Sequence, residues 1–223
     1  MLIQFLDYSL KKVQNEDLEL LRNWRNNDVL EFMINKEYIT AQMQQLWFER
    51  INNRNNFFFI IYKLNEPVGL IDIKEINWNL LTAETGIYIA NNKHRESETP
   101  LMATIMSAAF IAKILRLQKL LGKVLSSNKK AIAYNLSTGF KIINKESDIV
   151  TMCIDNYKVL DKIIELKDKL LHLQKDKYKI DTHIILLINK QIAEDDIGVK
   201  WLIENKIKKY FPHFEIDTPI NLL

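Results

Sequence analysis

The fold of this chain is decided by the stretch LSSNKKAIAYNLSTGF, residues 125–140. Its middle predicts a helix from Asn128 to Thr138, and Gly139 follows as the residue that ends a helix in the left-handed conformation. Apolar residues predict a strand on each side, Leu120–Ser126 before the helix and Phe140–Ile143 after it. The stretch therefore predicts a strand, a helix and a second strand in succession.

Outward from this stretch, the spacing of hydrophobic residues predicts further strands and helices. Residues 2–13 alternate like a strand, whereas Glu16–Asn26 has helical spacing, and Thr40 is placed to cap another helix. Thr99 and Pro100 suit the start of a long helix. The remaining predicted strands are Phe57–Tyr62 and Val68–Ile76, joined as a hairpin, then Ala83–Ala90 and Asp148–Ile154. This order predicts an α+β fold with a mixed central sheet.

The C-terminal part of the chain differs in character from the rest. Residues 155–223 carry two helical stripes of apolar residues, one from Tyr157 to Leu171 and one from Val199 to Tyr210, which Pro212 ends. His183–Ile188 fits a strand or a helix equally well. We therefore predict one domain over residues 1–154 and a mainly helical extension over residues 155–223.

The composition excludes several classes of protein and of site. Five glycines in 223 residues, about 2%, leave no Gly-rich phosphate loop. Cys153 alone forms no internal disulfide, and the four scattered histidines offer no zinc-type spacing. A net charge of +3, with basic and acidic residues interleaved, predicts no nucleic-acid partner. The absence of a signal-like or membrane-spanning stretch predicts a cytoplasmic protein without a membrane partner.

Four segments resemble the GNAT N-acetyltransferases. Residues 21–28 look like the family's "WRN" entry segment, residues 58–73 resemble its β-hairpin, and residues 84–89 resemble its fourth strand. The pattern N-x-x-A-I-x-x-Y-x-x-x-G-F within residues 128–140 is the most specific of the four. The resemblance covers roughly residues 10–154 and is nearest to bacterial nucleotide-aminosugar N-acetyltransferases of the pseudaminic-acid type. It implies a mixed sheet with helices on both faces.

The resemblance also implies a set of site residues. Acetyl-CoA would be the co-substrate, with its pantetheine arm paired to the strand backbone like an added strand and its pyrophosphate at the N-terminus of the following helix. Tyr134 would protonate the departing thiolate, and Glu84 would be the base, acting through water. Arg25 lies near where the family builds its acceptor pocket. Independently of the resemblance, Trp78 stands in a polar turn between Asn77 and Asn79, where an aromatic ring would stack on a sugar or a nucleotide base. The implied cofactor-binding residues are Ile87, Tyr88, Ile89, Arg95, Ser97, Thr99 and Asn128; no metal is implied.

Two positions depart from the family's pattern. One alignment puts Glu96 and Glu98 where the family has pyrophosphate-binding glycines, and a shift of one residue puts Ser97 and Thr99 there instead. The family's acid tyrosine would fall at Asn135, one residue after Tyr134. Tyr134 is therefore either the acid or a core residue, and two carboxylates beside a pyrophosphate would weaken cofactor binding.

Three functions follow from these observations. The favoured one is acetyl-CoA-dependent acetylation of a small-molecule amine, such as a nucleotide-linked aminosugar. The second is a GNAT-fold protein that has lost cofactor binding and serves in recognition or assembly. The third is acetylation of protein N-termini. A homodimer formed through the C-terminal extension is a further expectation.

Overall fold

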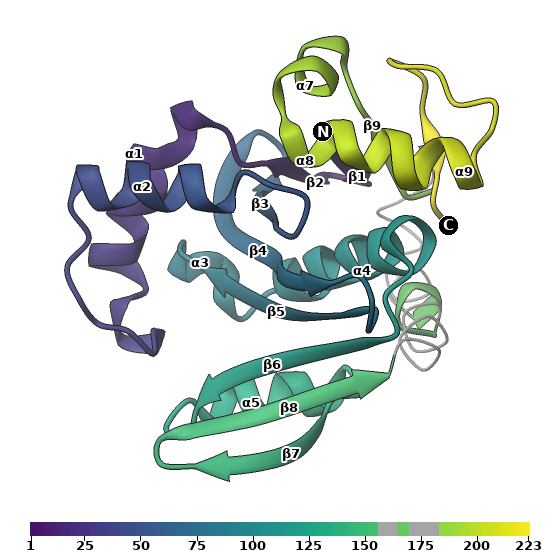
Figure 1. Ribbon diagram of the computed structural model, residues 1–223. Helices are drawn as coiled ribbons and strands as arrows, with labels where there is room; N and C mark the ends of the chain where they lie inside the picture. The colour runs from purple at the N-terminus through teal and green to yellow at the C-terminus, as the bar shows by residue number, and fades with distance from the viewer. Residues whose placement is uncertain (156–164, 170–182) are drawn as a thin grey trace.

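One ten-stranded sheet forms the centre of the molecule. The computed structural model describes residues 1–155, 165–169 and 183–223 (Figure 1). The strands follow the spatial order β10-β9-β1-β2-β3-β4-β5-β6-β8-β7, and β5–β6 is the one parallel pair among the described strands. Their bounds are β1 Leu2–Phe5, β2 Tyr8–Lys12, β3 Phe57–Lys63, β4 Glu66–Asn77, β5 Thr82–Ile89, β6 Lys119–Leu125, β7 Lys141–Glu146, β8 Ile149–Asp155, β9 Ile185–Leu187 and β10 Ile220–Asn221.

Helices cover both faces of this mixed sheet (Figure 1), as the family resemblance implies. Several α-helices continue into π-helical turns, namely α1 through 24–28, α4 through 111–115 and α8 through 203–207. Short 3-10 turns occupy 15–17 and 30–32. The α-helices are α1 Leu18–Asn23, α2 Ala41–Ile51, α3 Asn92–Arg95, α4 Thr99–Phe110, α5 Lys129–Ser137, α7 Lys190–Asp195, α8 Ile197–Leu202 and α9 Lys208–Tyr210.

The buried run in β3 supplies both faces of the sheet. Phe57 and Phe59 belong to the large core on the α4 side, whereas Phe58 and Ile60 belong to a second cluster beneath α1 and α2. Successive side chains of a strand point to opposite faces, so a run that is apolar throughout is buried on both. On the first face, small alanines allow α4 to lie close to the sheet, and its residues from Met102 to Phe110 are nearly all buried.

Two predicted boundaries differ in the structure. The predicted strand over residues 2–13 is a hairpin of β1 and β2, because Leu6 adopts a positive φ of 56° and turns the chain back. Glu98, not Thr99, is the N-cap residue of α4. The predicted caps at the other two helices are confirmed. Thr40 accepts a hydrogen bond from the Met43 N–H, and Gly139 follows α5 with a φ of 101°.

The described part of the C-terminal stretch is joined to the same sheet and core. Strand β9 pairs with β1, and β10 pairs with β9. Leu186, Val199, Leu202 and Ile207 are buried in the large core beside α4. Residues 185–187 are therefore strand, and residues 183–223 combine strands with short helices. Most of the predicted helix from Tyr157 to Leu171 lies outside the described residues.

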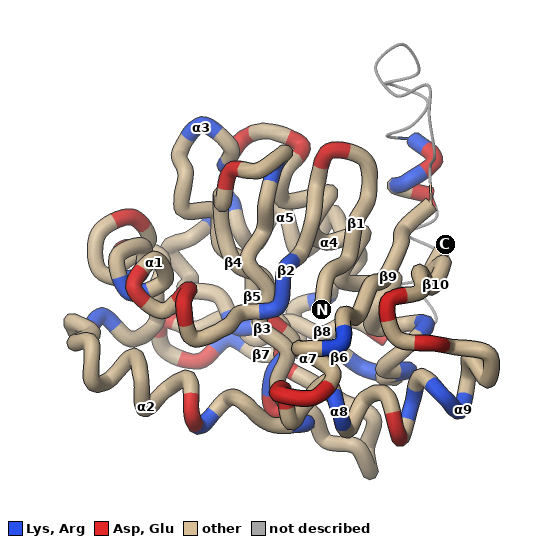
Figure 2. The backbone as a smooth tube through the Cα atoms, turned by 90° about the horizontal axis from the view of Figure 1, so that it is seen from above, with Lys and Arg blue, Asp and Glu red and all other residues tan. Residues whose placement is uncertain are grey.

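Figure 2 shows basic and acidic positions interspersed over the molecule. Within the described ranges, no helix combines the length and apolar character needed to cross a membrane. In the same ranges, no three His, Cys, Asp or Glu side chains are grouped so as to hold a metal ion.

Candidate active site

The sheet opens between its two parallel strands. Pairing of β5 with β6 runs from Thr82↔Lys119 to Glu84↔Leu121 and goes no further. Beyond that point β5 stays paired with β4 and β6 stays paired with β8, so the two halves of the sheet diverge (Figure 1). Residues 85–89 of β5 thus have no strand beside them on the β6 side among the described residues, and an extended ligand can take that place.

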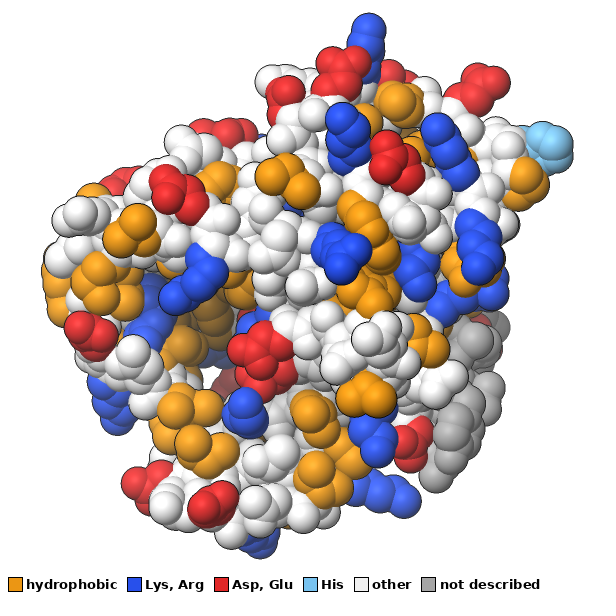
Figure 3. Space-filling model, in the orientation of Figure 1, with side chains coloured by type: hydrophobic (Ala, Val, Ile, Leu, Met, Phe, Trp, Pro, Cys, Tyr) orange, Lys and Arg blue, Asp and Glu red, His pale blue; other side chains and the backbone are white. Residues whose placement is uncertain are grey.

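A cavity of about 1360 Å³ occupies this opening. It extends from α1 and α2 on one side to α4 and α5 on the other, and Figure 3 shows the surface hollowed there. Ligand pockets for drug-sized molecules are usually ~300–1,000 Å³, so this cavity has room for more than one small ligand. A site that must hold two reactants at once needs such a volume.

Four of the predicted cofactor-binding residues line the cavity at the opening. Ile87, Tyr88 and Ile89 come from the unpaired part of β5, and Asn128 comes from the start of α5. The Asn128 side-chain oxygen caps α5 by accepting a hydrogen bond from the Ala131 N–H. The structure therefore brings these four residues together around the gap.

Arg95 also lines the cavity, and its guanidinium is engaged with backbone carbonyls. Nε donates to the Ile89 oxygen at 2.9 Å, and an Nη donates to the Asp28 oxygen at 2.6 Å. The guanidinium carbon also lies 5.0 Å from the centroid of the Phe32 ring. Arg95 thus ties the end of β5 to the segment after α1.

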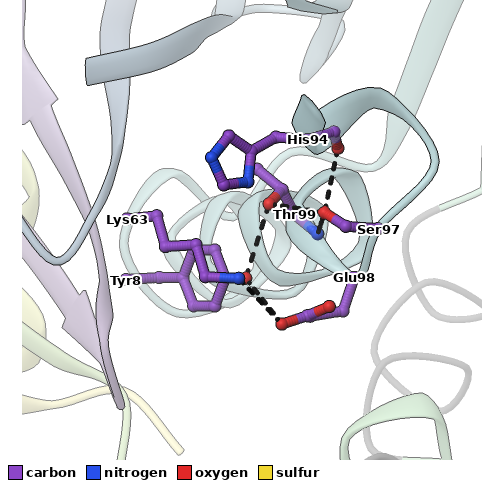
Figure 4. A network of polar contacts seen from close by, with 6 residues as sticks. All are labelled: Tyr8, Lys63, His94, Ser97, Glu98 and Thr99. Atoms are coloured by element: carbon purple, nitrogen blue, oxygen red, sulfur yellow. Dashed lines mark hydrogen bonds and ion pairs between the residues drawn. The ribbon is translucent and has the colours of Figure 1, made fainter. Parts of the chain in front are cut away.

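Ser97 and Thr99 lie outside the lining of the cavity. They belong to a polar network at the start of α4 (Figure 4), in which the Ser97 hydroxyl donates to the Thr99 hydroxyl and Tyr8 donates to Glu98. Hydrogen bonds from its own backbone N–H, from Lys63 and from Tyr8 lower the pKa of Glu98 to about 2 despite partial burial. The network braces the start of the helix, so these hydroxyls, and Glu98, are turned away from the cavity.

Glu96 is the acidic residue of this loop that faces the cavity. It forms an ion pair with Lys130 of α5, and both side chains are exposed. Because Glu96 and Lys130 come from opposite sides of the opening, their ion pair crosses its mouth. Pro100 lines the same end of the cavity and has no N–H, so α4 offers one donor fewer to an anion than a helix usually does.

Tyr134 is half-buried and packs against α4. Its hydroxyl lies 2.7 Å from the Thr104 hydroxyl, and both residues line the cavity. Burial raises the pKa of Tyr134 to about 12, partly offset by the hydrogen bond with Thr104. The hydroxyl is consequently protonated at neutral pH and able to donate. Asn135 lines the cavity too, with Nδ2 3.7 Å from the sulfur of Met152.

Glu84 lies at the last paired position of β5 and holds two lysines. Its Oε1 is 3.2 Å from Lys74 Nζ, and its Oε2 is 2.6 Å from Lys123 Nζ. Burial opposes ionisation of this carboxyl, but the hydrogen bond from Lys123 and the charge of Lys74 outweigh it and lower the pKa of Glu84.

Asp72 is a cavity residue that the sequence did not lead us to predict as part of the site. It lies on β4 in register with Gly86, lines the cavity and is only 8% exposed. One of its oxygens is 3.2 Å from Lys74 Nζ. The sequence did contain a signal for this residue: Asp72 is the single acidic residue within the apolar stretch Val68–Ile73. A carboxylate in such a stretch is buried, and a buried carboxylate is rare without a partner.

The two predicted substrate residues differ in position. Arg25 lines the cavity from the π-helical turn after α1, and its Nη1 is buried without a hydrogen-bond partner among the described residues. Trp78 lies outside the cavity lining. Its ring packs 4.4 Å from that of Trp201, and its Nε1 donates to Asn55. The structure thus places Trp201, and not a cavity ligand, against Trp78.

The comparisons with known proteins agree with this geometry. A family model described as an acetyltransferase (GNAT) domain matches residues 10–159. Spermidine N-acetyltransferase from Vibrio cholerae, solved with CoA and spermine, superposes with a TM-score of 0.63 at 22% identity, covering 69% of this chain and 98% of its own. Apo FdhC, a nucleotide-linked sugar GNAT, superposes with a TM-score of 0.64 at 20% identity, covering 74% and 96%.

A domain from Methanocaldococcus jannaschii has the same fold, with a TM-score of 0.58 at 21% identity over 66% of this chain and 97% of its own. Among curated protein sequences, none matches. At these identities the superpositions show the fold, whereas the family model spans more than half of the sequence. This chain belongs to the GNAT acetyltransferase family.

Proposed function

We propose that this acetyltransferase transfers the acetyl group of acetyl-CoA to the amine of a small molecule that also carries an anionic group, such as a nucleotide-linked aminosugar. The observation that carries the proposal is the cavity between β5 and β6, which lies beside residues 85–89 of β5. Among the described residues, no strand pairs with this segment on the β6 side. When bound, acetyl-CoA supplies the acetyl group as a thioester.

The residues of the cavity fit this co-substrate. Backbone groups of Ile87–Ile89 would pair with the amide-containing pantetheine arm, and Asn128 lies across the gap from them. Lys93 and Lys130 also line the cavity and offer charge to phosphate groups. Tyr134, protonated at neutral pH, is the group that we assign to protonate the leaving thiolate.

Charge favours an anionic acceptor over a polyamine. Seven basic residues line the cavity against four acidic ones, a balance of +3; the basic set is Arg25, Arg50, Lys74, Lys93, Arg95, Lys123 and Lys130, and the acidic set is Glu37, Asp72, Glu84 and Glu96. Buried polar groups in proteins nearly always have a partner, so the unpaired Nη1 of Arg25 calls for one. A phosphate of the acceptor would supply it.

The acceptor class is tested by free-thiol release from acetyl-CoA. A UDP-linked aminosugar, spermidine and a peptide with a free N-terminus are compared at equal concentration. We expect the UDP-linked aminosugar to react with the highest kcat/KM and Arg25→Met to raise its KM by about 10-fold or more, because a hydrogen bond to a charged group contributes ~1.5–3 kcal/mol.

The matched control is Arg22→Met. Arg22 lies on the same helix but forms an exposed ion pair with Glu19 outside the cavity lining, so its loss should leave KM unchanged. Preference for spermidine or for the peptide would contradict the proposed acceptor class, and equal effects of the two arginine variants would contradict the role of Arg25.

Glu96 is expected to weaken cofactor binding. A carboxylate about 4 Å from a phosphate charge costs ~1 kcal/mol in water, and the same carboxylate occupies Lys130. Glu96→Gln should therefore lower the Kd for acetyl-CoA by about 5-fold in calorimetric titration at low salt. Glu98→Gln should leave this Kd unchanged, because the Glu98 side chain is hydrogen-bonded to Tyr8 and Lys63. A Glu96→Gln variant that binds acetyl-CoA no tighter would refute the expected repulsion.

The homodimer predicted through the C-terminal extension stays a prediction.

A further inference from the structure

Four charged side chains form a line across three strands at the point where the sheet opens. Lys74 Nζ lies 3.2 Å from an oxygen of Asp72 and 3.2 Å from one of Glu84. Lys123 Nζ lies 2.6 Å from the other oxygen of Glu84. Asp72 and Lys74 belong to β4, Glu84 to β5 and Lys123 to β6, and all four line the cavity.

The absence of a side chain at Gly86 leaves room for the Asp72 carboxylate beside the opening. The two residues are opposite each other on β4 and β5, and a Cβ on Gly86 would be 3.1 Å from Asp72 Oδ2. The carboxylate therefore occupies the space that a side chain at position 86 would need. Gly86 is two residues beyond Glu84, the last residue of β5 that pairs with β6. Asp72 thus lies next to the unpaired strand along which the thioester arm would run.

The two carboxylates of the line differ in how fully they are paired. Each oxygen of Glu84 has a lysine, whereas Asp72 has one lysine, Lys74, and accepts a hydrogen bond from the Gly86 N–H. Burial raises the pKa of Asp72, and Lys74 together with the hydrogen bond from the Gly86 N–H only partly offsets this effect. Lys123 acts in the opposite sense on Glu84 and lowers its pKa. The charged or titratable groups that face Asp72 are Lys74 on its own strand and Glu84 and Tyr88 on β5.

We propose that Asp72 is a catalytic residue that accepts the proton of the acceptor ammonium, and that Glu84 positions Lys74 beside it. The proposal rests on the proposed acetyl transfer. The ammonium gives one proton to Asp72, and the free amine then attacks the acetyl carbon. The N–C bond forms, the C–S bond breaks with its electron pair going to sulfur, and the nitrogen loses a second proton. The thiolate gains a proton from Tyr134, which regains one from the nitrogen, and Asp72 releases its own to solvent.

The test compares Asp72→Asn with Glu84→Gln, using whichever amine of the acceptor panel is acetylated. Proton transfer by a positioned side chain contributes about 10²–10⁴-fold to rate. Asp72→Asn should lower kcat by that factor, with the affinity for acetyl-CoA unchanged in calorimetry. Glu84→Gln should lower kcat less than about 10-fold. It should also move the acidic limb of the kcat profile to lower pH, because the negative charge of Glu84 raises the pKa of Asp72.

A second measurement does not require the acceptor. The full chain labelled with ¹³C at aspartate carboxyls is titrated by NMR, with Asp72→Asn assigning the signal. We expect the pKa of Asp72 to lie above the usual aspartate range, and a value at or below that range would overturn the proposal. An Asp72→Asn variant that keeps the wild-type kcat would also overturn it. So would a Glu84→Gln variant whose kcat falls further than that of Asp72→Asn. If no amine is acetylated, the proposed function fails, and the NMR titration still decides whether Asp72 is suited to take up the proton.

Discussion

Gly122→Leu is expected to abolish acetyl-CoA binding while the protein stays folded. Gly122 is the first residue of β6 beyond its pairing with β5, and it lines the cavity. A Cβ there would meet the Phe140 ring at 3.6 Å, the Thr85 oxygen at 3.8 Å and Asn135 at 3.9 Å, which are ordinary contacts. Gly122 lines the cavity, so a longer side chain here would take up part of the space that we propose for the thioester arm. The affinity should fall by ~100-fold or more, equivalent to about 2.8 kcal/mol.

Gly122→Ala separates blocking from unfolding. Its single methyl group fits the available space, and alanine in a strand interior is favoured over glycine by roughly 0.5–1 kcal/mol. This variant should keep its acetyl-CoA affinity within a few-fold and be at least as stable as the wild type. Thermal unfolding of both variants, followed by titration, makes the comparison. If the leucine variant binds as tightly as the alanine variant, the cofactor does not occupy this gap.

Asp196→Ala is expected to be strongly destabilising. Asp196 forms a buried ion pair with Lys12 of β2, each side chain only 5% exposed. Its other oxygen accepts a hydrogen bond from the Val199 N–H at 2.9 Å and caps α8. Removal of one partner leaves a buried unpaired charge, which costs about 3–5 kcal/mol. The melting temperature should fall by roughly 10 °C for a chain of this size.

The double variant Lys12→Met with Asp196→Asn serves as the control. Methionine fills the space of the lysine stem without a charge, and asparagine remains a good N-cap residue. Replacement of both members of a buried pair is often neutral, so the double variant should recover most of the lost stability. An Asp196→Ala variant within about 1 kcal/mol of the wild type in urea unfolding would show that the pair does not secure the C-terminal stretch.

The sequence predicted the elements of the fold better than their arrangement. The apolar run Phe57–Tyr62 predicts a buried strand, and the structure confirms it. Periodicity alone did not predict that β5 and β6 would separate after three residue pairs. The separation depends on tertiary pairing, because β5 follows β4 and β6 follows β8 beyond that point. A strand edge free to pair with the co-substrate arm was expected only through the family resemblance.

The site was predicted in part for a related reason. Glu84 was identified, but Lys74 and Lys123, which lower its pKa, lie on neighbouring strands and approach it only in the folded sheet. The direction in which a loop side chain points is also set by tertiary packing. The Ser97 hydroxyl is hydrogen-bonded to Thr99 at the start of α4, and the Trp78 ring packs against Trp201, which lies far along the chain.

The most direct measurement is a calorimetric titration of acetyl-CoA into the wild-type protein, with thermal unfolding followed at each concentration. We predict one bound molecule per chain and a gain in stability of ~2.7 kcal/mol at 100 times the Kd. Absence of both heat and stabilisation up to millimolar acetyl-CoA would contradict the account and leave an acetyltransferase fold that does not hold its co-substrate.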